Sequence, residues 1–112
     1  MSIVAIADLT KDAERAFGPA FRGELAVASC ETFEESHYRG GFRLRLAGTT
    51  GSCEVLYSDM QLEVRFNGRE VFGNNVHAGF EGNMFSREHL REYLPRIAAS
   101  AAAGAQAGNV HG

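Results

Sequence analysis

Two β-hairpins are predicted by the stretch CEVLYSDMQLEVRFNGREVF, residues 53–72. Its apolar residues alternate with polar ones, but the alternation changes phase between Tyr57 and Met60. A single straight strand would place the two apolar sets on opposite faces of a sheet. A two-residue turn at Ser58-Asp59 returns both sets to one face, because it pairs Tyr57 with Met60. The same register pairs Val55 with Leu62 and Cys53 with Val64.

The second hairpin is predicted to turn at Asn67-Gly68, because both residue types accept the positive φ angles of a type I′ turn. This turn places Val64 opposite Val71 on the core face and Arg65 opposite Glu70 on the other face. The predicted sheet core consists of apolar residues on one face of the strands: Phe42, Leu44, Leu46, Val55, Leu62, Val64 and Val71.

Two earlier strands are predicted upstream of these hairpins. Leu25, Val27 and Phe33 share one parity in the first of them. The second alternates Phe42, Leu44 and Leu46 with two arginines. The glycines and threonines of residues 48–51 mark the break that follows it. Residues 25–72 therefore favour an antiparallel meander of four to five strands.

A helix is predicted before the meander, because Ile3, Ile6, Leu9, Ala13 and Phe17 recur at steps of three or four. Ser2 is its expected N-cap, and Gly18-Pro19 its expected end. A short strand over residues 2–7 followed by a shorter helix is an alternative that this pattern leaves open.

After the meander, residues 73–84 carry three glycines and three asparagines without a period, which predicts a long loop. Ser86 is the expected N-cap of a final helix, and Phe85 and Leu90 have the spacing of a hydrophobic staple. Pro95 lies inside this helix and should kink it or split it. We therefore predict one α+β domain over residues 1–100, with the C-terminal helix packed on the sheet, and a partly disordered Ala/Gly-rich tail over residues 101–112.

Composition narrows the possible partners. The net charge is −3, and the arginines are scattered along the chain, whereas a nucleic-acid-binding protein requires clustered positive charge. No segment approaches the length of a membrane span, and the N-terminus lacks the features of an export signal. We therefore expect a cytoplasmic protein that binds neither nucleic acid nor membrane, and that holds no cofactor.

Candidate catalytic groups are few, because none of the common nucleotide, hydrolase or zinc motifs occurs. His77 and His89 could combine with Glu81 or Glu88 in a metal or acid-base site, but a solvated loop and helix start explain them more simply. The two cysteines, Cys30 and Cys53, are too few for a disulfide framework and are expected to be reduced core residues. The chain is therefore predicted not to be an enzyme.

Two regions are candidates for contact with a partner. The first is the acidic stretch of Glu31, Glu34 and Glu35, which Glu54, Asp59 and Glu63 extend to one negative surface if they lie beyond the core face. The second is the long loop with Phe80 and Glu81, where an adaptable backbone carries a large side chain. For Phe80, packing into the core is an equally good interpretation.

The order of elements resembles that of small immunity proteins, which neutralise bacterial polymorphic or contact-delivered toxins. The resemblance rests on residues 54–59 and 63–73, then Phe85-Ser86 and the helix with Leu90 and Leu94. It covers most of the chain but is one of architecture, since no family-defining motif is matched.

The resemblance implies a stoichiometric inhibitor that occludes the active site of a cognate toxin without a catalytic step or cofactor. The partner-binding residues we predict are Glu31, Glu34, Glu35, Phe80 and Glu81. Two alternatives stay open: a secretion chaperone acting as an acidic dimer, and a small-molecule-binding domain or enzyme with a pocket between the sheet and the C-terminal helix. The oligomeric state is left undetermined.

Overall fold

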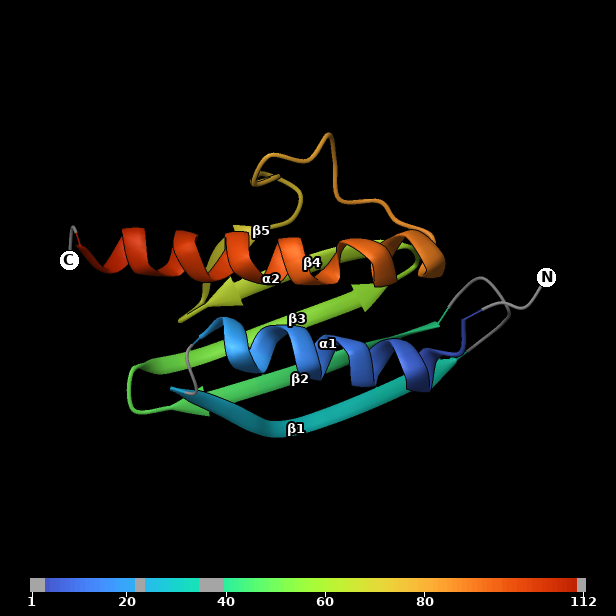
Figure 1. Cartoon of the computed structure of the whole chain (residues 1–112), viewed down its shortest axis with the longest axis horizontal. Helices are drawn as coiled ribbons and strands as arrows, with labels where there is room; N and C mark the ends of the chain where they lie inside the picture. The colour runs from blue at the N-terminus through green and yellow to red at the C-terminus, as the bar shows by residue number, and fades with distance from the viewer. Residues whose placement is uncertain (1–3, 22–23, 35–39, 111–112) are drawn as a thin grey trace.

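The computed structural model describes residues 4–21, 24–34 and 40–110 (Figure 1). The elements follow one another as α1 (Ile6–Ala20), β1 (Leu25–Glu34), β2 (Gly40–Gly48), β3 (Gly51–Ser58), β4 (Gln61–Phe66), β5 (Arg69–Phe72) and α2 (Arg87–Val110). The five strands form an antiparallel sheet in the order β1-β2-β3-β4-β5. The predicted α+β fold is thereby confirmed.

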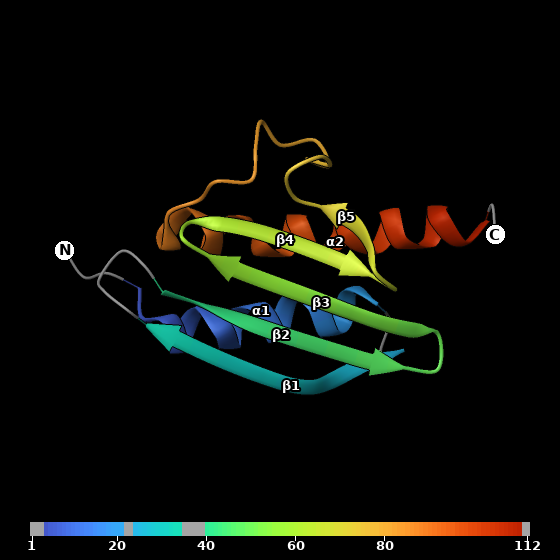
Figure 2. The same ribbon diagram turned by 180° about the vertical axis from the view of Figure 1, so that it is seen from behind.

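Both helices lie on the same face of the sheet (Figure 1). Helix α1 contacts β1 and β2, helix α2 contacts β5, and the two helices contact each other. Seen from behind, the strands lie in front of both helices, and within the described residues no helix covers the other face of the sheet (Figure 2). We call this uncovered side the open face.

Helix α1 begins at Ile6, later than predicted, and its N-cap Ala5 makes no side-chain capping bond. The expected cap, Ser2, lies outside the described residues. The alternative of a strand over residues 2–7 is wrong for its last two residues, which are helical. The helix also continues through Pro19 to Ala20. Proline fits there because its fixed φ is helical and it removes one hydrogen bond from the last turn only.

The β3-β4 hairpin turns one residue later than predicted. Asp59 and Met60 both have positive φ, 51° and 68°, and Ser58 pairs with Gln61. Tyr57 therefore lies opposite Leu62, and Met60 is a turn residue without a strand partner. The predicted register was wrong by two positions, a shift that leaves the same side chains on the core face because the side-chain period of a strand is two.

The β4-β5 hairpin turns at Asn67-Gly68 as predicted, with φ of 51° and 82°. Arg65 pairs with Glu70 as expected. Val64, however, pairs with Phe72, because the register shifts after Arg65 and leaves Val71 as an extra residue on β5. A bulge of this kind buries both Val71 and Phe72, at 3% and 0% exposure.

Strand β1 contains a second bulge, between Val27 and Ser29. The extra residue reverses the alternation of side chains along the strand. Val27 consequently pairs with the core residue Leu46, while Phe33 pairs with Gly41 and faces the open side. The predicted single apolar face of Leu25, Val27 and Phe33 was therefore wrong.

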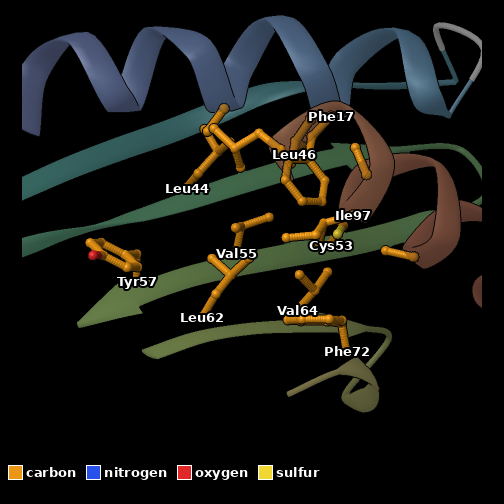
Figure 3. Close-up of a cluster of buried hydrophobic side chains, with 14 of the residues drawn as sticks. Phe17, Leu44, Leu46, Cys53, Val55, Tyr57, Leu62, Val64, Phe72 and Ile97 are labelled. Atoms are coloured by element: carbon orange, nitrogen blue, oxygen red, sulfur yellow. The ribbon is translucent and has the colours of Figure 1, made fainter. Parts of the chain in front are cut away.

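The core lies between the sheet and the helices (Figure 3). The seven residues predicted for the sheet core are all buried, with exposures of 3% or less. Phe17 of α1 and Ile97 of α2 are fully buried against them. The Tyr57 hydroxyl donates a hydrogen bond to the Phe85 carbonyl at 2.7 Å, which ties β3 to the start of α2.

Helix α2 is capped as predicted, since Ser86 Oγ accepts a hydrogen bond from the His89 amide at 3.3 Å. Pro95 does not split the helix. The helix runs past residue 100 to Val110, so the Ala/Gly-rich segment does not begin a tail there. Alanine has the highest helix propensity, and Ala101, Ala102 and Ala105 are buried in the core.

Candidate partner-binding surface

The structure separates the two regions predicted to contact a partner. Glu31 is exposed on β1, and Glu34 is the last residue of that strand. Glu35 lies outside the described residues. Phe80 and Glu81 belong to the loop after β5, which is the opposite edge of the sheet. The predicted residues therefore do not form one continuous site.

Phe80 is part of an aromatic cluster that anchors the long loop to α2. Its ring lies 5.8 Å from Phe72, 6.3 Å from Phe85 and 5.6 Å from Tyr93, in each case edge to face. The Arg96 guanidinium lies 5.0 Å above the Phe80 ring, at cation-π distance. This packing supports the core interpretation of Phe80, whereas its neighbour Glu81 is exposed.

The asparagines of the loop also have structural contacts. The Glu70 carboxylate accepts hydrogen bonds from the backbone and side-chain nitrogens of Asn75, at 3.3 and 3.2 Å. The Asn83 amide donates to Asn74 Oδ1 at 2.9 Å, and the Asn83 carbonyl accepts from the Leu62 amide of β4. These hydrogen bonds connect the start of the loop to β5 and its end to β4.

The open face carries alternating charges across neighbouring strands. Arg45 of β2 lies opposite Glu54 of β3, Glu54 opposite Arg65 of β4, and Arg65 opposite Glu70 of β5. The Arg45 guanidinium donates to the Glu54 carboxylate at 3.1 Å, and Arg65 forms an ion pair with Glu63 on its own strand. The predicted negative surface was wrong for Glu54 and Glu63, because arginines on this face neutralise them.

Apolar side chains lie among these charges. Phe33 is 39% exposed on β1, and Leu56 of β3 is half-buried. Met84 is 62% exposed, and its isolated bridge to Gln61 places both side chains on the open face. A small crevice of about 70 Å³ lies beside them, lined by Leu56, Ser58, Gln61, Glu63, Asn74 and Asn83.

Comparison with protein-family models, curated proteins and solved structures found no match.

The cysteines are poor nucleophiles. Both are free thiols, Cys30 half-buried and Cys53 buried with 2% of its surface exposed. Burial raises the pKa of the Cys53 thiol to about 12, and the neighbouring Glu54 carboxylate adds to the effect. The thiolate is the reactive form, so Cys53 is chemically inert near neutral pH, as its predicted core position implied.

His77 and His89 do not assemble a site either. His77 lies in the loop, where Nε2 is 3.1 Å from the Asn74 carbonyl, and His89 is exposed in the first turn of α2. Within residues 4–21, 24–34 and 40–110, no three His, Cys, Asp or Glu side chains are grouped to hold a metal ion. In the same ranges, no helix has the length and apolar character needed to cross a membrane.

Proposed function

We propose that this chain is an immunity-type protein that binds a cognate bacterial toxin through the open face of its sheet and occludes the toxin's active site. The observation that carries the proposal is the open face itself. It is a five-stranded surface that neither described helix covers, and it presents Arg43, Arg45, Arg65, Phe33 and Met84 to solvent.

The residue types on this face are those that protein interfaces favour. Interfaces are enriched in Arg, Phe and Met and depleted in Lys. Ten of the 11 basic residues in the chain are arginine, and the described part of the open face has three of them. The Arg45 guanidinium donates a hydrogen bond to Glu54 at 3.1 Å, which orders it before a partner arrives, and Arg43 forms a longer ion pair with the same carboxylate at 3.9 Å. Groups that are already ordered lose less entropy on binding.

The size of the face also suits an inhibitor. Five strands about 4.8 Å apart span about 19 Å, and the eight residues of β3 extend about 27 Å, which gives a flat area of roughly 500 Å². A stable interface buries about 800 Å² on each partner. The open face would therefore form the centre of an interface, and the rim would come from the neighbouring loop and Asp59.

The proposal is tested by isolating the partner from the host with a tagged chain, and then measuring with purified components whether the chain inhibits the partner's activity at a one-to-one ratio. Phe33→Asp is the informative variant. Val27→Asp is its matched control, because Val27 lies on the same strand with similar exposure, 43% against 39%, but on the helix side. Both variants are first checked for the unfolding midpoint of the parent chain.

The proposal expects inhibition that Phe33→Asp weakens at least tenfold and Val27→Asp leaves unchanged, since a buried aromatic contact in an interface contributes about 2 kcal/mol or more. Equal inhibition by both variants would exclude the open face as the contact surface. A partner that is bound but not inhibited, together with a dimeric mass of the chain in solution, would favour the secretion-chaperone alternative.

A further inference from the structure

A groove with a volume of about 520 Å³ runs between the two helices. The α1 side of it is lined by Asp12, Arg15, Ala16, Pro19 and Ala20, and the α2 side by Arg91, Leu94, Pro95 and Ala99. On each helix these positions recur at steps of one, three or four residues, so they form one stripe. Each stripe spans eight residue steps, or about 12 Å along its helix.

Beyond the charged residues at one end, the groove is lined by apolar residues, most of them small. Ala16, Ala20 and Ala99 have only a methyl group, and the two prolines add short rings that present no donor or acceptor. Leu94, with 1% exposure, closes the bottom of the groove. Pockets that bind small molecules commonly measure about 300–1,000 Å³ and are mainly apolar, so this groove lies in that range.

Both arginines at the groove share one carboxylate. The Arg91 Nε atom lies 2.7 Å from Asp12 Oδ2, and an Arg15 Nη atom lies 3.8 Å from Asp12 Oδ1. Among the residues that line the groove, two guanidinium groups and one carboxylate leave one positive charge, although the chain as a whole carries −3. Each arginine has several N–H donors, and one shared carboxylate does not occupy them all.

We propose that this groove binds a small amphiphilic carboxylate, whose apolar chain lies along the alanines and prolines and whose carboxylate binds Arg15 and Arg91. The ligand carboxylate would restore charge balance at the groove and accept charge-assisted hydrogen bonds. A neutral apolar molecule fits the groove but leaves the positive charge uncompensated. The proposal does not depend on the open face, because the groove lies between the helices on the other side of the sheet.

Octanoate is the probe, and the readout is the change of backbone amide shifts in a two-dimensional nitrogen–proton NMR titration of the full chain. Octanol is titrated in parallel to separate the apolar contribution from the charge. We expect octanoate to shift amides around residues 12–20 and 91–99, and to bind about tenfold more tightly than octanol. Shifts that are absent, or that lie elsewhere in the chain, would overturn the proposal, as would equal affinity for the two probes.

Two variants with matched controls test the geometry. Ala99→Leu fills the groove and should abolish octanoate binding, whereas Ala103→Leu lies one turn further along α2, also exposed but outside the groove, and should not. Arg15→Gln combined with Arg91→Gln should weaken octanoate binding about tenfold while leaving octanol binding unchanged. Arg45→Gln on the open face is the control for a lost positive charge. Unchanged octanoate binding in Ala99→Leu would refute the assigned site.

Discussion

The hydrogen bond between Tyr57 and the Phe85 carbonyl should be a main stabilising contact between the sheet and the start of α2. Tyr57 is 1% exposed, its hydroxyl donates at 2.7 Å, and its ring lies 6.0 Å from Phe42. Tyr57→Phe keeps the ring and removes the donor. The Phe85 carbonyl then stays buried without its partner, which costs about 1–3 kcal/mol.

We expect Tyr57→Phe to lower the free energy of unfolding by about 1.5 kcal/mol. For a chain of 112 residues this corresponds to a fall in Tm of about 6 °C. The measurement is urea unfolding followed by circular dichroism, in which the midpoint should fall while the slope m stays constant.

Tyr93→Phe is the control, because it also removes one hydroxyl from a ring in an aromatic cluster. Among the described residues, the Tyr93 hydroxyl has no hydrogen-bond partner, and its ring contacts to Phe80 and Phe85 would remain. The expected change for Tyr93→Phe is within about 0.5 kcal/mol. If both variants lose the same small amount of stability, the assigned role of the Tyr57 hydroxyl is refuted.

Three further results are expected. Met60→Gly should raise the free energy of unfolding by about 0.5–1 kcal/mol, because Met60 has a φ of 68°; a loss in urea unfolding would instead support the turn at Ser58-Asp59. With its pKa of about 12 against an ordinary 9.0, the Cys53 thiol ionises first in the unfolded chain, so its contribution to stability is complete below pH 9 and disappears between pH 9 and 12. Urea unfolding across that range should show a shallower decline for Cys53→Ala, and an unchanged decline would contradict the assignment. Deleting residues 101–112 should lower Tm by more than 10 °C in thermal melts, because it removes buried Ala101 and Ala105, whereas a disordered tail could be deleted without effect.

Sheet topology was predictable from the sequence because two turns and a strict alternation constrain it. The prediction of the Asn67-Gly68 turn is confirmed, and so is the burial of the seven sheet-core residues. The register of the first hairpin was not predictable in this way. Moving the turn from Ser58-Asp59 to Asp59-Met60 shifts pairing by two positions, and the apolar pattern is identical for both. In the observed turn the Met60 carbonyl accepts a hydrogen bond from the Phe85 amide, a long-range contact that the periodicity of the hairpin does not contain.

The bulges and the end of α2 show what single-sequence periodicity misses. An extra residue in β1 turned Phe33 to the open face, and no glycine or proline marks that position. The extension of α2 did leave a signal. Ala98, Ala101 and Ala105 continue the spacing of Leu94 and Ile97, and all are buried. Their small size made the stripe look like a low-complexity tail, although small residues are what close contact between α2 and β5 requires.

The charge of the open face depends on pairs that are distant in the sequence. Glu54 appears acidic beside its chain neighbours, but Arg45 on β2 and Arg65 on β4 lie directly opposite it. Once a hairpin around residues 48–51 is assumed, the pairing of Arg45 with Glu54 follows from counting back along both strands. This pairing indicates an arginine-rich sheet face as the contact surface, where the acidic residues taken alone indicated a negative one. A partner that binds the proposed interface would complement alternating charges, which favours a protein surface with its own mixed charges over a uniformly basic one.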